Sequence, residues 1–209
     1  MKRLFTVIIA LACVAAAFAQ TPEEILSRME EEMEKHMDEG LIMTISTKVP
    51  VVGTVTMKNY SLRNKTRSES KMMGTDVVVF TDGETEWTYY SKTNKVKIER
   101  IGITGSSEGG DEEMFSDISD GYDLTLTKET DDAWYLTCKK SKTNQDKDMP
   151  KTIELVIAKG TYYPKLLKAK VSGITFSMRD VSFGVSEDYV TFRLSDYPGA
   201  TVEDERNKK

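Results

Sequence analysis

The sequence predicts a mainly β protein of the α+β class, in which a single helix packs on an extensive antiparallel sheet. Three observations support this fold class. One amphipathic helical pattern stands near the start of the chain, at residues 22–39. After Gly40 apolar residues recur at every second position, which is typical of half-buried strands. Turn residues interrupt these runs about every 8 to 12 residues, which leaves little room for the crossovers of a parallel sheet.

The first residues form a segment that precedes the fold. In MKRLFTVIIALACVAAAFAQ, two basic residues are followed by an apolar run that ends in the small-x-small sequence Ala17-Phe18-Ala19. This is the pattern of a secretory signal peptide, and the run is too short for a durable membrane span. We therefore expect a leader at 1–19 and one mature domain at 20–209, soluble outside the cytoplasm.

A competing interpretation makes Cys13 the lipidated first residue of a lipoprotein, because Leu11-Ala12-Cys13 resembles part of a lipobox. Ala10 stands where a larger aliphatic residue is usual, and four more apolar residues follow the cysteine. These two departures favour the soluble form.

Charge and cysteine content narrow the function classes. Removing residues 1–19 takes Lys and Arg from 29 to 27 against 34 Asp and Glu, so the formal net charge changes from −5 to −7. An acidic chain without a basic stripe is not typical of a nucleic-acid-binding protein. Cys138 then remains as the only cysteine, so no internal disulfide forms. Its alternation with Trp134 and Leu136 predicts a buried, inert thiol.

The segment TPEEILSRMEEEMEKHMDEG predicts the helix. Thr21 is a suitable N-cap, Pro22 suits the first helical position, Glu24 completes a capping box, and Gly40 can end the helix in the left-handed conformation. Its apolar stripe repeats every four residues and consists of Ile25, Met29, Met33 and Met37, with Leu26 beside them.

The alternating patterns after Gly40 predict the strands. Asp82-Gly83 predicts the turn of a hairpin, and we expect Val77, Val79, Trp87 and Tyr89 to share its apolar face. We expect the tail after Pro198 to fray. The predicted strands are 41–46, 54–58, 62–70, 76–81, 85–90, 94–101, 122–128, 133–140, 152–158, 162–171, 173–183 and 189–194.

Residues 102–123 form one long connection. Its start is rich in Gly and Ser, and Met114, Phe115 and Ile118 then recur at helical spacing. We expect a loop that carries a short amphipathic helix at 111–118, because loops of this length often act as lids or binding elements. The acidic residues of this segment do not match the spacing of an EF-hand, so no metal site is predicted.

The supply of catalytic groups is small. His36 is the only histidine and stands among glutamates in the predicted helix. One histidine and one remaining cysteine cannot build a histidine- or thiolate-based zinc site, and no glycine-rich phosphate loop is present. No nucleophile elbow surrounds any serine. We therefore expect a protein that is not an enzyme and needs no cofactor.

Two stretches carry recognisable motifs. Val79, Asp82, Gly83, Trp87 and Tyr89 match V-x-DG-x-x-x-W-x-Y, with one extra residue before Asp82. Phe192, Pro198, Gly199, Val202 and Asp204 match F-x-F-x-x-P-x-G-V-x-V-x-D more loosely. Together these stretches resemble the hairpin and the terminal segment of the LolA family of periplasmic lipoprotein carriers. Order and spacing agree over nearly the whole mature chain.

The resemblance implies a curved antiparallel half-barrel of about 10–11 strands, with an N-terminal helix and a short helix packed on its apolar concave face. Such proteins receive acyl chains from an inner-membrane lipoprotein release complex, shield them, and pass them to an outer-membrane acceptor. We expect a monomer. The lipid-binding candidates are Met29, Met33, Met37, Met43, Ile45, Val55, Met57, Val79, Trp87, Tyr89, Val96, Ile98, Met114 and Phe115.

One departure concerns the lid, which in this family is formed by the helices that cover the concave face. Family members have an Arg-Pro pair whose arginine holds the lid closed, whereas here the region reads MKNYSLRNKTRSES with no such pair. Arg63 and Arg67 are the candidates for that role.

Two other functions stay open. The same fold can serve as a periplasmic sensor or interaction module that binds a regulatory protein. A hydrolase acting through the carboxylates of 111–123 is the third alternative.

Overall fold

The computed structural model describes residues 20–51, 53–101, 118, 120–147 and 149–207, and the account below concerns these residues. Several predictions concern residues outside these ranges. They are the leader with Cys13, and the short helix at 111–118 with Met114 and Phe115, of which only Ile118 is described. Among the described residues no helix is both long and apolar enough to cross a membrane. The described helices are α2 (Pro22–His36), η1 (Met37–Glu39), α3 (Glu187–Val190) and η2 (Leu194–Asp196).

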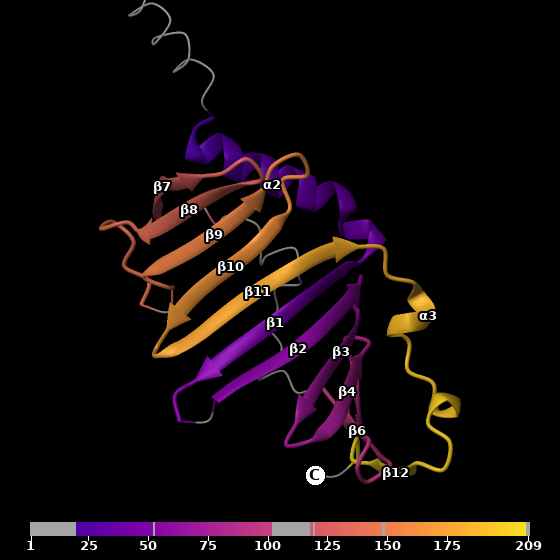
Figure 1. The fold of residues 1–209 in the computed structure, drawn as a ribbon. Helices are drawn as coiled ribbons and strands as arrows, with labels where there is room; N and C mark the ends of the chain where they lie inside the picture. Colours follow the sequence, from indigo (N-terminus) through magenta and orange to yellow (C-terminus); the bar gives the residue numbers. More distant parts are fainter. Residues whose placement is uncertain (1–19, 52, 102–117, 119, 148, 208–209) are drawn as a thin grey trace, which may run out of the picture.

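The strands form one open, curved sheet in the order β12-β6-β5-β4-β3-β2-β1-β11-β10-β9-β8-β7. Neighbours pair antiparallel except β12, which runs parallel to β6. Because β7 and β12 lie at opposite ends of this order, the sheet does not close (Figure 1). The strands are β1 (Leu41–Val49), β2 (Gly53–Leu62), β3 (Lys65–Met72), β4 (Thr75–Thr81), β5 (Thr85–Tyr90), β6 (Lys95–Arg100), β7 (Tyr122–Glu129), β8 (Ala133–Lys140), β9 (Thr152–Ala158), β10 (Pro164–Val171), β11 (Ile174–Phe183) and β12 (Thr201–Asp204).

Helix α2 begins as its sequence predicts. The Thr21 side chain accepts a hydrogen bond from the Glu24 backbone N–H, and the Glu24 carboxylate accepts one from the Thr21 N–H, so the capping box is complete. The helix passes into η1 and ends at Gly40, whose φ of 80° lies in the region that favours glycine.

Strand register divides the sheet into two faces. Directly paired residues lie on the same face, and the pairs Ile42–Tyr60, Tyr60–Arg67, Arg67–Phe80 and Phe80–Trp87 run across one of them. We call this the opposite face. The other, which carries Met43 and is covered by α2, we call the helix face.

The main core lies between α2 and one half of the helix face. Ile25, Leu26, Met29 and Met33 from the helix are at most 1% exposed. Their neighbours in the core come from β1 and from β7 to β11, and Figure 1 shows α2 beside this half of the sheet. The core residues of the sheet are Leu41, Met43, Tyr122, Trp134, Leu136, Cys138, Ile153, Leu155, Ile157, Ala169 and Met178.

The C-terminal segment, residues 185–200, lies on the opposite face. Val185 and Val190 are buried with Tyr60, and Phe192 stacks on Trp87 with ring centroids 5.4 Å apart. The predicted strand at 189–194 is therefore wrong, since α3 and η2 occupy this region. The expectation of a frayed tail is also wrong, because Thr201–Asp204 pairs with β6 and the Lys95 and Glu203 side chains form an ion pair.

The predicted face of the β4–β5 hairpin needs a correction. Val79 pairs with Thr88 and Phe80 pairs with Trp87, so Val77 and Val79 lie on the helix face while Trp87 and Tyr89 lie on the opposite face. In this register Gly83 and Glu84 are the two turn residues, and a two-residue turn pairs odd-numbered with even-numbered positions. The hairpin itself is confirmed, with the Asp82 carboxylate accepting hydrogen bonds from the N–H groups of Glu84 and Thr85.

Candidate functional site

The candidate site is the apolar layer between α2 and its half of the helix face. Four methionines meet there: Met29 and Met33 from α2, Met43 from β1 and Met178 from β11, each at most 3% exposed. Met37 and Met149 pack at the margin of the layer. Methionine is unbranched and polarisable, so such a layer can repack around an apolar guest more easily than one of β-branched residues.

Tyr162 fastens the N-terminal part of α2. Its hydroxyl accepts a hydrogen bond from Arg28 Nη1 at 3.1 Å and one from Gln20 Nε2 at 3.0 Å. The guanidinium carbon of Arg28 lies 5.5 Å from the centre of the tyrosine ring, and Tyr162 stacks on Trp134 at a centroid distance of 5.1 Å. A hydrogen bond and a cation–π contact from Arg28 thus join the helix to the β9–β10 connection, Gln20 adds a hydrogen bond just before the helix, and the stacking on Trp134 holds the tyrosine on β8.

The C-terminal end of α2 is fastened by backbone contacts. Gly184 N–H donates to the Gly40 carbonyl at 3.1 Å, and Val185 N–H donates to the Glu39 carbonyl at 2.8 Å. A Cβ placed on Gly40 would lie 2.7 Å from Val185 Cβ, so this junction requires glycine. The His36 ring packs against Phe183 with a centroid distance of 5.3 Å.

The apolar character of the helix face changes along the sheet. From β2 to β5 this face carries buried Asn59, Ser61 and Thr88. Ser68 Oγ donates to Asn59 Oδ1 at 2.6 Å, so the amide oxygen has its partner within the sheet. The methionine layer is therefore bounded on one side by a polar row.

The register separates the predicted lipid-binding residues into two groups. Met43, Ile45, Val55, Met57 and Val79 lie on the helix face, which α2 approaches with Met29, Met33 and Met37. Trp87, Tyr89, Val96 and Ile98 lie on the opposite face. Because the sheet separates the two groups, a single acyl site cannot contain both. That any of them binds lipid stays a prediction.

Trp87 and Tyr89 of the second group belong to an aromatic cluster beneath the C-terminal segment. Trp87 stacks on Phe192, and Tyr197 lies 4.3 Å from Tyr89 and 5.7 Å from Phe192 between ring centroids. The packing of residues 185–200 over these aromatic side chains was not predicted from the sequence, because residues 189–194 were expected to form a strand. The bulky aromatic residues of that stretch were the available signal.

Arg67 belongs to the same face. Its guanidinium carbon lies 4.1 Å from the Tyr189 ring centroid and 5.2 Å from that of Phe80, and Nη2 pairs with Glu69 at 2.7 Å. These contacts join the C-terminal segment to the sheet, and none of them involves α2. Arg63 lies in the β2–β3 turn with a φ of 56°. That either arginine holds a lid closed stays a prediction.

Two grooves lie outside the methionine layer. One of about 520 Å³ lies mainly on the opposite face and is lined by charged residues that include Lys58, Arg67 and Glu69. The other, of about 640 Å³, lies beside Glu84, Arg100 and Arg206. Sequence reasoning predicted neither groove. The charged lining of the second groove suits water or ions better than acyl chains.

The titratable groups of the layer are neutral. Burial raises the pKa of the Cys138 thiol to about 11, so it carries no charge at neutral pH. Burial also raises the pKa of Tyr122, whose hydroxyl donates to the Pro150 carbonyl at 2.9 Å. In the part of the chain that the structure describes, no three His, Cys, Asp or Glu side chains are grouped to hold a metal ion. The layer therefore presents apolar surface rather than reactive groups.

No protein-family model matches the chain, and no curated protein matches its sequence. Among solved structures, an uncharacterised conserved protein from Thermus thermophilus is similar with a TM-score of 0.47 and 16% identity, over 85% of this chain and 98% of that one. A chain of the MucA/MucB complex of Pseudomonas aeruginosa has a TM-score of 0.40 and 14% identity, over 79% of this chain and 61% of that one. A LolA superfamily protein from Nitrosomonas europaea has a TM-score of 0.34 and 12% identity, over 84% of this chain and 99% of that one. The structural neighbours of this chain thus include LolA superfamily proteins, and at these identities the likeness is one of fold alone.

Proposed function

We propose that this protein is a non-enzymatic periplasmic carrier that shields the acyl chains of a lipoprotein between α2 and the apolar half of the helix face. The observation that carries the proposal is the methionine layer, to which Met29 and Met33 come from the helix and Met43 and Met178 from the sheet. A site that takes flexible chains of inexact shape is best lined by side chains that repack at small cost.

Cargo enters this site when α2 moves away from the sheet. In the described structure Met29 and Met33 fill the layer, at 0% and 1% exposed. The polar contacts that oppose the movement are at the two ends of the helix, at Tyr162 and at Gly40. Each net hydrogen bond contributes about 1 kcal/mol, whereas each buried CH₂ of an acyl chain contributes about 0.8 kcal/mol. A chain of about a dozen CH₂ groups therefore outweighs the contacts at Tyr162, even after some methionine packing is lost.

Loading by an inner-membrane release complex and delivery to an outer-membrane acceptor belong to the same proposal. They follow from the resemblance of the hairpin and of the C-terminal sequence to the LolA family. The apolar leader, read as a signal peptide, supports export to the compartment in which such transfer takes place.

Mass spectrometry of the protein purified from its native periplasm tests the proposal. We expect acyl chains or a lipoprotein to accompany it, and a fluorescent fatty acid to bind to the emptied protein. Well-folded protein with no accompanying lipid and no fluorophore binding would contradict the carrier function.

Two variants locate the site. Met33→Gln keeps the side-chain length but adds a polar group to the layer, so we expect weaker binding of the fluorophore. Trp87→Gln makes a similar change on the opposite face and should leave binding unchanged. Urea unfolding of both variants separates lost binding from lost folding. If Trp87→Gln alone weakened binding, the acyl site would lie beneath the C-terminal segment instead.

A second candidate function is a sensor or interaction module that binds a regulatory protein. The filling of the methionine layer favours it, because a helix that stays on the sheet leaves no space for cargo. Crosslinking in the periplasm distinguishes the two functions. A module of this kind gives one tight protein partner, and its depletion alters a stress response without mislocalising lipoproteins.

A further inference from the structure

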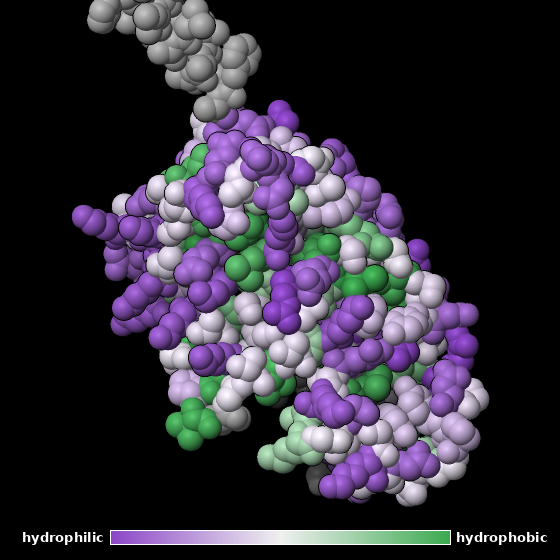
Figure 2. Space-filling view, viewed as in Figure 1, coloured by the Kyte–Doolittle hydropathy of each residue, from purple (hydrophilic) through white to green (hydrophobic). Residues whose placement is uncertain are grey.

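Three hairpins end at the same end of the sheet with exposed apolar side chains. The β1–β2, β3–β4 and β10–β11 connections lie at the same end of the sheet (Figure 1). We call this end of the sheet the hairpin end. Val51 and Met73 are fully exposed at the β1–β2 and β3–β4 tips, at 108% and 103% of their reference areas. Met72 is 51% exposed, and Phe176 near the β10–β11 tip is 39% exposed. Figure 2 shows green side chains at the β1–β2 and β3–β4 tips.

Local backbone preference does not explain these residues. Val51 and Met73 have φ values of 69° and 49°, in the left-handed region where Gly, Asn and Asp are favoured and a β-branched residue is rare. Packing does not explain them either, because both side chains are exposed to solvent. Apolar residues at positions where both backbone preference and hydration oppose them are a sign of a binding surface.

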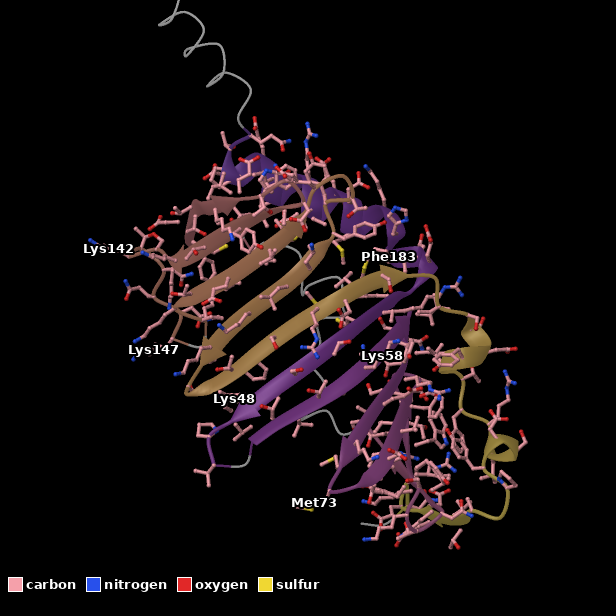
Figure 3. All side chains as sticks on the ribbon, viewed as in Figure 1. Lys48, Lys58, Met73, Lys142, Lys147 and Phe183 are labelled. Atoms are coloured by element: carbon pink, nitrogen blue, oxygen red, sulfur yellow. The ribbon has the colours of Figure 1, made fainter. Side chains whose placement is uncertain are left out.

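Exposed lysines surround the tips. Each of the three hairpins has a lysine just before its tip. Lys48 precedes Val51 by three residues, Lys71 precedes Met72 by one, and Lys170 precedes Ser172 by two. The two further connections at this end, β5–β6 and β8–β9, carry more lysines. Figure 3 places Lys48, Met73, Lys142 and Lys147 along one margin of the molecule. The exposed lysines of the hairpin end include Lys48, Lys71, Lys92, Lys139, Lys142, Lys147, Lys151 and Lys170. Its exposed acidic residues include Asp146 and Asp76, and Asp76 pairs with Lys71 at 3.7 Å.

The other end of the sheet is closer to balanced in charge. Its connections, after β2, β4, β7 and β9, carry Asp82, Glu84, Asp131 and Asp132 against Arg63 and Lys159. At the adjoining strand ends Glu129 pairs with Lys159 and Lys165 pairs with Asp132, and Arg100 adds a further base. A chain with a net charge of −7 after loss of the leader thus gathers positive charge at the end that also exposes apolar side chains.

We propose that the hairpin end docks on the surface of a phospholipid bilayer that carries anionic headgroups. The apolar side chains of Val51, Met72 and Met73 enter the boundary between headgroups and acyl chains, and the lysines approach the phosphates. Because the other end is closer to balanced in charge, the charge distribution also orients the molecule. This docking does not depend on any ligand beneath α2, so it stands or fails separately from the carrier function.

Cosedimentation with vesicles tests the apolar contribution. The protein beginning at Gln20 is mixed with vesicles of phosphatidylethanolamine and phosphatidylglycerol, and in parallel with vesicles of phosphatidylcholine alone. We expect binding to the first. The double variant V51N/M73N places Asn where the backbone is left-handed, so folding is kept and affinity falls roughly tenfold or more. L194N, at a 48%-exposed leucine of η2 outside the three hairpins, is the matched control and should bind like the unchanged protein.

Charge reversal tests the electrostatic contribution. K48E/K170E and R63E/R100E change the net charge equally, the first pair at the hairpin end and the second at the other end. We expect the first variant to lose roughly tenfold or more in affinity, the second to keep it, and added salt to weaken binding of the unchanged protein. No binding to anionic vesicles, or equal losses in both variants, overturns the proposal. If V51N/M73N instead changed the oligomeric state in gel filtration, the hairpin end would be a contact between copies of this chain.

Discussion

The hydroxyl of Tyr162 accepts a hydrogen bond from the Arg28 guanidinium at 3.1 Å, which joins α2 to a connection more than a hundred residues away in the sequence. The same hydroxyl also accepts from Gln20, and the tyrosine ring lies between Arg28 and Trp134. This contact holds the part of α2 that is farthest from its fixed C-terminal end at Gly40. It is therefore the contact that should control how often the methionine layer opens.

Tyr162→Phe tests this role of the hydroxyl. The variant keeps the ring stacked on Trp134 but removes both hydrogen bonds, so we expect a loss of about 1 kcal/mol in the free energy of unfolding. We also expect faster amide hydrogen exchange in the first turns of α2 and faster binding of a fluorescent fatty acid. Tyr135→Phe is the matched control, because the described contacts of Tyr135 include no hydrogen bond from its hydroxyl. Unchanged exchange in α2 would show that Tyr162 does not hold the helix.

Gly40→Ala tests the junction between α2 and β1. The added Cβ would meet Val185 Cβ at 2.7 Å and the Ser61 carbonyl oxygen at 2.8 Å, at a residue with positive φ. We expect a loss of roughly 2 kcal/mol or more in urea unfolding, because backbone strain and steric overlap add. Gly160→Ala is the control, since its φ is 89° and no atom lies within 4 Å of the position that its Cβ would take. Gly160→Ala should lose only the free energy that a non-glycine residue costs at a positive φ. Equal losses in both variants would mean that Val185 moves aside freely.

The strand positions could be predicted because alternation and turn residues are local signals. Residues 85–90, 133–140 and 152–158 form strands with the predicted bounds. Even the polar segment 62–70 largely became β3. The alternation within a strand does not tell which side of the sheet a residue of the partner strand faces. That depends on whether the connecting turn has an even or an odd number of residues. Trp87 was therefore placed on the wrong face, although its strand was right.

The C-terminal region shows a second limit of prediction. Residues 187–190 and 194–196 form short helical turns because Tyr189, Val190 and Phe192 pack on the opposite face, and this contact outweighs their β propensity. Strand β12 is only four residues long and pairs parallel with a strand about a hundred residues earlier. The aromatic residues of the first segment signal burial but not the face on which they pack, and the pairing of β12 has no signal within its own four residues. The methionine stripe of α2, in contrast, was readable because helical periodicity alone defines it.

Cys138 makes the free energy of unfolding depend on pH in the alkaline range. Burial raises the pKa of its thiol from 9.0 to about 11, so the folded state keeps a proton that the unfolded state loses first. The resulting stability is fully present below the unfolded pKa and is lost as the pH rises from about 9 to about 11. We expect the difference in unfolding free energy between the unchanged protein and Cys138→Ala to shrink by roughly 2 kcal/mol over this range. Thiol labelling of the folded protein should stay slow until urea unfolds it, and rapid labelling without urea would contradict the burial.

Arg67→Met tests whether this arginine fastens the C-terminal segment or α2. The substitution keeps an apolar chain between Phe80 and Tyr189 but removes the cation–π contacts and the pair with Glu69. Because the guanidinium is half-buried, we expect a loss of roughly 1–3 kcal/mol in the free energy of unfolding. Limited proteolysis should then cleave within residues 185–200, while hydrogen exchange in α2 stays unchanged. Arg63→Met, at an exposed arginine in the preceding turn, serves as the control and should behave like the unchanged protein. Faster exchange in α2 with an intact C-terminal segment would instead assign Arg67 to the lid, as the LolA resemblance first implied.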